Sequence, residues 1–226
     1  MSIQNLTLLI AGIINLIMSV LVFARGIKHN KVNFYFSLLT FFNFLWAISL
    51  FIFSIHYSYN VDLFFASFIN VGAIFLVWAL FYFSIYFPYQ IFKLSKVIFI
   101  STNFLVVIFS IFLIVYYKIF ITELLPNDII HYSFIPYLLL TIIIIFFMLA
   151  SIIILSIKYN RAEGIFKNQI ALILITVIIG GVVGGFFDLF LMYFDNFKYY
   201  HLGPLAALLI NLVAFYLIFL KGKQLS

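Results

Sequence analysis

Seven long stretches of apolar residues, separated by short polar connectors, run through the whole chain. They cover residues 6–24, 32–55, 63–87, 97–117, 135–157, 169–193 and 202–220. Each has about 19 to 25 residues, the length that an α-helix needs to cross ~30 Å of hydrocarbon at ~1.5 Å per residue. The pattern predicts an all-α integral membrane bundle of seven transmembrane helices, which forms a single domain over residues 1–226.

The basic residues indicate the orientation of this bundle. Ten of the 12 Lys and Arg residues follow the odd-numbered stretches: Arg25, Lys28, Lys31, Lys93, Lys96, Lys158, Arg161, Lys167, Lys221 and Lys223. The other side has Lys118 and Lys198. Because basic loops stay in the cytoplasm, we expect the N-terminus outside and the C-terminus in the cytoplasm. The expected location is the cell membrane, plasma or inner, with multiple crossings.

Composition limits the classes of function. With 67% hydrophobic and 8% charged residues, the chain has too little polar surface for a soluble globule, and the lipid bilayer is its expected partner. The net charge of +6 follows from the basic connectors, which suit anionic lipid headgroups, and nucleic-acid binding is not expected. The absence of cysteine excludes disulfides and thiolate chemistry.

Enzymes and cofactor proteins of familiar seven-helix types are also not expected. The seventh stretch has no lysine for the attachment of retinal, and no histidine lies within any stretch. The spans therefore lack the histidines that haem ligation by paired histidines and Ser–His proteolysis within the membrane both require. The two glutamates, Glu123 and Glu163, lie in connectors and form no HExxH motif. We expect neither a catalytic site, nor a metal site, nor a cofactor.

Several amides lie within the predicted spans. Asn15, Asn43 and Asn211 lie at or next to the midpoints of the first, second and seventh helices, while Asn70 lies in the outer half of the third. Three amides at equal depth are placed to form a polar network, each hydrogen bond contributing ~0.6–2 kcal/mol. They serve either as structural contacts or as part of a ligand or ion site.

The sixth predicted helix holds four glycines and a carboxylic acid. Gly180, Gly181, Gly184 and Gly185 form two overlapping small-xxx-small pairs, which predict close packing against a neighbouring helix. Asp188 follows on the same face. It is the only residue of a charged type inside a predicted span. A carboxyl at membrane depth is costly, which indicates either a functional site or a protonated, hydrogen-bonded structural group.

Asp188 is therefore the principal candidate for a ligand site or a switch, with Asn70 and His201 as further candidates. Lys198 and His201, in the connector after the sixth helix, are the nearest basic residues in sequence. A closure of this connector over Asp188 favours the ionised carboxyl, whereas burial without a cation favours the neutral acid. The longest connector, 118–134, lies on the same outer side and is expected to form a small lid.

The sequence from Lys167-Asn168-Gln169 through the glycines to Asp188, then Gly203-Pro204 and an apolar last helix, resembles a known family. It is similar to the end of the seven-helix N-terminal region of prokaryotic sensor histidine kinases. Trp46, Gly72 and the aromatic run ending in Phe83…Phe87-Pro88 agree with this resemblance. It covers essentially all 226 residues.

The resemblance implies a sensory module of a two-component signal transduction system, in which the seventh helix passes a signal to a cytoplasmic output. The chain ends where the kinase or other output domain is expected. A cytoplasmic or membrane output protein, such as a kinase, is therefore the implied partner, and a homodimer is a further possibility. The alternative function is a small transporter or permease-like subunit built around the midplane asparagines. The lack of a glycine cluster in the first half weighs against it, because transporters often contain corresponding repeats.

Overall fold

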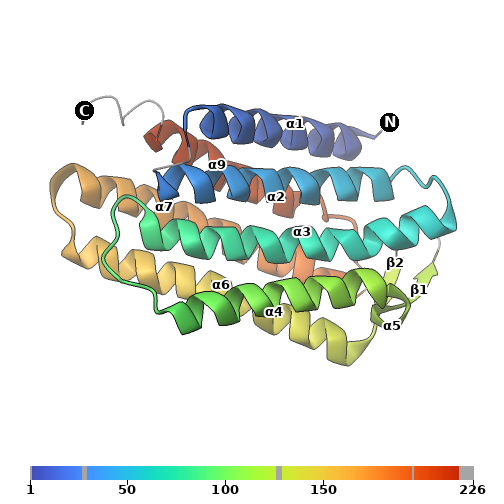
Figure 1. Ribbon diagram of the computed structural model, residues 1–226. Coiled ribbons are helices and arrows are strands. Elements are labelled where there is room, and N and C mark those ends of the chain that lie inside the picture. The colour runs from blue at the N-terminus through green and yellow to red at the C-terminus, as the bar shows by residue number, and fades with distance from the viewer. Residues whose placement is uncertain (1, 27–29, 126–128, 195, 219–226) are drawn as a thin grey trace.

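The computed structural model describes residues 2–26, 30–125, 129–194 and 196–218, and nearly all of them lie in helices. The long helices are α1 (Ile3–Ala24), α2 (Lys31–Phe53), α3 (Tyr59–Tyr86), α4 (Lys96–Val115), α6 (Phe134–Arg161) and α7 (Gly164–Gly184). Helix α7 continues through a π-helical stretch, η1 (Gly185–Phe190), into the short helix α8 (Leu191–Tyr193). Helix α9 (Leu202–Tyr216) completes the described bundle (Figure 1).

Local sequence explains where several helices begin and end. The side chains of Ser2, Asn30 and Ser95 precede α1, α2 and α4, and each accepts a hydrogen bond from a backbone N–H of the first turn. Such caps satisfy donors that have no partner within the helix. Helix α3 ends immediately before Phe87-Pro88, because proline cannot continue a helix and restricts the residue before it.

Within the described residues, six helices are long and apolar enough to cross a bilayer, when α7, η1 and α8 are taken as one helix of 30 residues. The prediction of an all-α, multi-pass membrane protein is confirmed at this level. The seventh predicted span corresponds to α9, of which 15 residues form a described α-helix. Phe219 and Leu220, predicted to end this span, lie outside the described residues.

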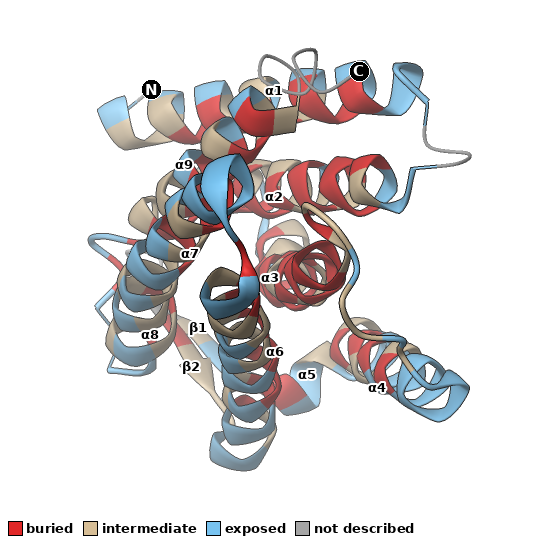
Figure 2. Cartoon of the chain, turned by 90° about the vertical axis from the view of Figure 1, so that its left-hand side faces the viewer, coloured by how far each residue is buried: buried red, intermediate tan, exposed pale blue. Residues whose placement is uncertain are grey.

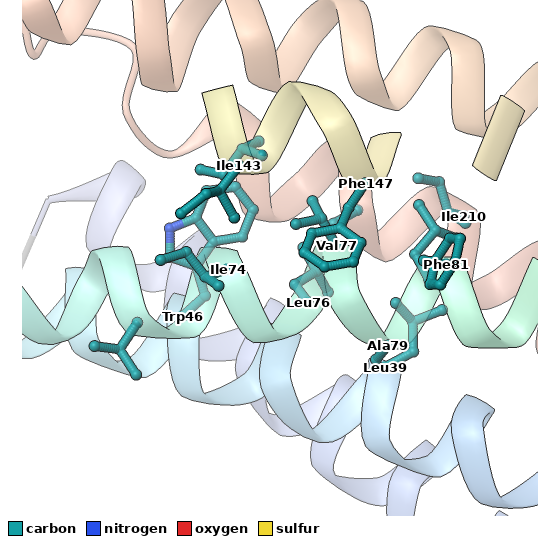
Figure 3. Packing of buried hydrophobic residues seen from close by; sticks show 14 of the residues in the cluster. Leu39, Trp46, Ile74, Leu76, Val77, Ala79, Phe81, Ile143, Phe147 and Ile210 are labelled. Carbon is teal, nitrogen blue, oxygen red and sulfur yellow. The ribbon is translucent and has the colours of Figure 1, made fainter. Parts of the chain in front are cut away.

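Helix α3 is the centre of the bundle, as the end-on view in Figure 2 shows. In its most apolar window, 67% of the residues are buried. Helices α2, α4 and α6 pack around it. In Figure 3, Phe147 of α6 lies over Val77 and beside Phe81 of α3, and the rings of Phe81 and Phe147 are 5.5 Å apart. The opposite side of α3 is held close to α2 at Gly72, where an added Cβ would lie 3.0 Å from the backbone of Trp46.

The remaining helices complete a ring around the bundle interior. Helix α7 packs between α6 and α9, and α9 packs in turn against α1 and α2. Helices α2, α3, α6, α7 and α9 therefore surround a common space (Figure 2). The outward faces of α1, α4, α6 and α7 expose many Ile, Leu, Val and Phe side chains, as expected for a surface in contact with lipid.

The predicted lid over residues 118–134 has regular structure of its own. It contains a single helical turn, α5 (Tyr117–Phe120), and an antiparallel hairpin of β1 (Ile121–Leu125) and β2 (Ile129–Tyr132). Residues 126–128, between the strands, lie outside the described residues. The hairpin contacts α3 and α8 at one end of the bundle (Figure 1). The rings of Tyr132 and Tyr137 lie 4.6 Å apart and connect the hairpin to the start of α6.

Basic residues gather at the opposite end from the hairpin. Three contacts bring this end together: Lys31 lies over the Tyr86 ring, Tyr89 packs on Phe166, and Arg25 donates a hydrogen bond to the carbonyl of Ile218. Of the residues used to predict orientation, this end holds Arg25, Lys31, Lys93, Lys96, Lys158, Arg161 and Lys167. Lys118 and Lys198 lie at the hairpin end. Lys28, Lys221 and Lys223 lie outside the described residues.

Five of these basic residues, Lys31, Lys96, Lys158, Arg161 and Lys167, lie within helices and not in connectors, which corrects their predicted places. Lys158 differs most from its prediction. Helix α6 extends to Arg161, so that Lys158 lies within it and is fully buried. Its ammonium donates hydrogen bonds of 2.6–2.7 Å to the carbonyls of Ile85, Phe87 and Tyr89. These carbonyls lie at and beyond the C-terminus of α3, where a helix leaves acceptors unpaired and favours a positive charge. Lys158 thus attaches the end of α3 to α6.

Candidate functional site

Asp188 lies in the π-helical stretch η1, with 9% of its surface exposed. Neither carboxyl oxygen has a hydrogen-bond partner, and within the described part of the chain no Lys, Arg or His forms an ion pair with it. Almost every buried polar group in a folded protein is paired. π-helical turns are frequent at functional sites, and here the turn coincides with an unpaired carboxyl.

The Asp188 carboxyl is packed directly against the first turn of α9. A Cβ atom added to Gly203 would overlap the Asp188 carboxyl group and would lie 2.8 Å from Cη2 of Trp46. The missing side chain of Gly203 is therefore what allows Asp188, Trp46 and α9 to meet. The N-terminus of a helix carries partial positive charge, which favours an ionised carboxyl, whereas the apolar surroundings favour the neutral acid. The balance between them depends on what contacts the carboxyl.

Two tyrosines, Tyr132 and Tyr137, lie near Asp188. Tyr132 of the hairpin and Tyr137 of α6 both lie close enough to interact electrostatically with its carboxyl group. Tyr137 donates a 2.8 Å hydrogen bond to the carbonyl of Leu189. Burial raises the pKa of the Tyr132 phenol well above its ordinary value, and the phenol interacts with the side chain of Asn70. Tyr132 therefore stays a neutral hydroxyl at physiological pH.

Asp188 faces a cavity of about 300 Å³ between α2, α3, α6, α7 and α9. Its walls are mainly apolar, and its polar lining residues are Trp46, Asn70, Asp188 and Asn211. A volume of this size lies at the lower end of the range for small-molecule sites, about 300–1,000 Å³. An apolar cavity with a few convergent polar groups has the general character of such a site.

The structure brings together two of the three midplane asparagines. Asn211 of α9 donates a 2.7 Å hydrogen bond to the side-chain oxygen of Asn15 in α1. Asn43 instead donates to the carbonyl of Pro204 at 3.4 Å, in the first turn of α9. Asn70 bonds to the carbonyl of Ala66 within its own helix and lies near Tyr132, on the Asp188 side of the cavity. The amides therefore connect α9 to α1 and α2.

The predicted packing of all four glycines is wrong for two of them. Added Cβ atoms at Gly180 and Gly181 would lie 2.6 Å from Ile210 and Met148, so these positions pack closely against α9 and α6. At Gly184 and Gly185, no described atom outside the helix itself lies within 4 Å. Both line the cavity instead. Gly184 and Gly185 face open space because α7 contacts α6 at Met148 and the two helices leave a gap beyond that contact.

Neither basic residue of the following connector pairs with Asp188. The ammonium of Lys198 lies 5.4 Å from the ring of Tyr199 on the surface. His201 precedes α9, and its Nδ1 is buried without a hydrogen-bond partner. Burial lowers the pKa of the His201 imidazole, which favours its neutral form. In the described part of the chain, no three His, Asp or Glu side chains lie together as a group of metal ligands.

Sequence reasoning missed three residues of this site. No sequence pattern distinguishes Tyr132 and Tyr137 from the many other aromatic residues. Gly203 was noted in the sequence only as part of the family resemblance. Their roles follow from contacts between α6, the hairpin and α9. The single signal available was that Gly203-Pro204 opens the last helix, where a residue without a side chain leaves space for a neighbour.

Comparisons of the chain with protein-family models, with curated proteins and with solved structures found no match in any of the three. The resemblance to the N-terminal region of sensor histidine kinases therefore stays a prediction.

Proposed function

We propose that the chain is a membrane sensory module of seven spans, in which the Asp188 cavity receives a signal and α9 carries it to the cytoplasmic end. The observation that carries this proposal is the contact between the unpaired Asp188 carboxyl and Gly203. Because the carboxyl touches the first turn of α9, any proton or ligand that pairs with it acts directly on that helix.

The contacts along α9 support its role as the output element. Asn43 holds its first turns through Pro204, Asn15 holds its middle through Asn211, and Arg25 holds its far end through Ile218. A displacement at Gly203 therefore acts against α1 and α2 along the whole helix. We propose that a cytoplasmic output protein, such as a kinase, reads this displacement.

The orientation in this proposal places the hairpin outside and the basic end in the cytoplasm. Single cysteines at Ser2 or Glu123 should react with a membrane-impermeant thiol reagent in intact cells, whereas a cysteine at Lys93 should not. All three positions are exposed, and the natural chain has no cysteine that contributes background. Labelling of Lys93→Cys but not of Ser2→Cys or Glu123→Cys contradicts the orientation; permeabilised cells, in which all three should react, serve as the control.

The response of Asp188 can be followed through Trp46, which lies against the same point on Gly203. The chain has two tryptophans, and Trp78→Phe leaves Trp46 as the only one. This replacement also removes a buried indole N–H that has no partner. In vesicles, the emission of Trp46 should shift as external pH changes the charge of Asp188. In Asp188→Asn, which keeps the size but cannot ionise, the shift should be lost while folding is retained.

Other titratable groups around Asp188 need their own controls. They are Tyr132 on β2, Tyr137 on α6, Tyr193 on α8, which stacks on Tyr137, and His201 before α9. His201→Gln and Tyr132→Phe should each retain the pH-dependent shift. If instead the shift persists in Asp188→Asn and disappears in His201→Gln, the switch is the histidine and the proposal is wrong.

A further inference from the structure

The Asp188 cavity opens sideways, between α6 and α7, toward the lipid. Four apolar side chains line the cavity and are also exposed on the outer surface of the bundle: Ile145 and Leu149 on α6, and Ile178 and Val182 on α7. Their exposed fractions are between 42% and 67%. A side chain that both lines a cavity and faces outward lies on its rim. These four rim side chains are all apolar and come from two membrane helices.

The α7 wall beside this rim is kept open by Gly184 and Gly185. No described atom beyond the helix lies within 4 Å of a Cβ added at either position. The α6 wall touches α7 at Met148, whose flexible side chain would collide with a Cβ at Gly181. Two glycines and a flexible methionine therefore leave space on this side of the cavity for a molecule that enters from the bilayer.

In the described part of the chain, the buried polar atoms of the cavity lining that have no hydrogen-bond partner are three oxygens. They are both carboxyl oxygens of Asp188 and Oδ1 of Asn211, and all three are buried. No described donor bonds to the Asp188 carboxyl, and the nearby amides of Asn211 and Asn70 donate to Asn15 and Ala66. A molecule that complements this cavity must therefore be apolar over most of its surface and must bring its own donor to the Asp188 end.

We propose that the cavity binds a membrane-dissolved amphiphile, an apolar chain with a terminal hydroxyl group, which enters between α6 and α7 and donates a hydrogen bond to Asp188. The proposal names the ligand class for the sensory site and in that respect rests on the proposed function. A lipid-side route fits the apolar rim, because a ligand that dissolves in the bilayer reaches this opening without crossing water. Displacement of the Asp188 carboxyl by the hydroxyl acts on Gly203 and thus on α9.

Bromine quenches tryptophan fluorescence at short range, so Trp46 in the cavity wall reports a bound brominated chain. The Trp78→Phe protein is reconstituted in phosphatidylcholine vesicles, and 9,10-dibromooctadecanol is added. A phosphatidylcholine with dibrominated chains, at the same mole fraction of bromine, measures quenching by bulk lipid. The alcohol should quench at least twofold more strongly and should saturate. The methyl ether of the same alcohol, which has no donor, should quench no more than the phospholipid.

Two variants and a matched control locate the bound chain. Gly184→Leu fills the opening, and Asp188→Leu removes the acceptor; each should reduce quenching by the alcohol to the level of the phospholipid. Phe186→Leu changes a neighbouring residue that is 47% exposed and does not line the cavity, so it should retain full quenching. Circular dichroism and gel filtration check that the variants are folded.

The outcomes separate the ligand from the switch. Equal quenching by alcohol and phospholipid, or full quenching in both Gly184→Leu and Asp188→Leu, overturns the proposed ligand. If the pH response of Trp46 is then still present, the proposed function survives without this ligand. Saturable quenching that depends on Asp188, without any pH response of Trp46, supports the binding site and contradicts proton sensing there.

Discussion

Replacing Lys158 with methionine is expected to lower the free energy of unfolding by at least about 3 kcal/mol, since three acceptors lose their donor and each buried acceptor left without one costs about 1–3 kcal/mol. The ammonium is fully buried and donates to three carbonyls at and beyond the end of α3. Methionine has a similar length but donates no hydrogen bond. The carbonyls of Ile85, Phe87 and Tyr89 would lose this donor, and the connection between α3 and α6 would be lost with it.

Thermal unfolding in detergent, followed by circular dichroism, measures this effect. Lys93→Met is the matched control, because Lys93 lies exposed in the connector between α3 and α4 and its loss should change stability little. Equal midpoint temperatures for the two variants would show that water replaces the ammonium at the three carbonyls. In that case Lys158 would be a surface cation with a buried stem, and the attachment of α3 to α6 would rest on apolar packing alone.

Gly203→Ala is expected to destabilise the protein by about 3 kcal/mol, the upper end of the usual range for an overfilled core. The added methyl group would overlap the Asp188 carboxyl and contact Trp46. The methyl group must displace the Asp188 carboxyl toward the cavity or shift η1 or α9. The emission of Trp46 should shift as well, because its indole ring contacts the same point.

Gly184→Ala provides the opposite result at another cavity glycine. A Cβ at this position meets no described atom beyond its own helix within 4 Å, and the backbone is ordinary α-helix. Alanine is favoured over glycine in a helix by about 1 kcal/mol, so the variant should be as stable as the natural chain or slightly more stable. Two alanine variants with the same effect would show that the contact between Gly203 and Asp188 is not as close as described.

The helices illustrate what could be predicted from hydropathy alone. Six predicted stretches match helices long enough to cross a bilayer, because length and apolar composition are properties of each segment. The observed helix ends differ from the predicted ends where tertiary contacts stabilise residues that are not apolar. Helix α6 continues past its last apolar residues and includes Lys158, since the carbonyls of α3 supply partners for a lysine in the bundle. Residues 118–134 were predicted as a connector that forms a small lid, but its two strands were not predicted, because their pairing is stabilised by packing on α3 and α8.

Some features of the candidate site were likewise predicted from the sequence, and others were not. Sequence alone identified Asp188, since a carboxyl within an apolar span is conspicuous wherever it points. It also placed Asn15 and Asn211 at equal depth, and their side chains meet. It did not separate Gly180 and Gly181, which pack, from Gly184 and Gly185, which do not. A small-xxx-small pattern marks a face that permits close approach, but a neighbouring helix must also be present at that level.

The sequence by itself determined that this is a helical membrane protein, because a chain with 67% hydrophobic residues in long uninterrupted stretches must satisfy its backbone within helices in lipid. It also identified Asp188 as a carboxyl within a span, although α3 begins at Tyr59 and so contains a second buried carboxyl, Asp62, which the sequence analysis placed in a connector. Only the tertiary structure decided that Asp188 meets Gly203 and Trp46, that Lys158 holds the end of α3, and that residues of α2, α3, α6, α7 and α9 line one cavity. These features depend on which helices are neighbours and at what height they touch, and hydrophobic periodicity within one helix contains no information about either.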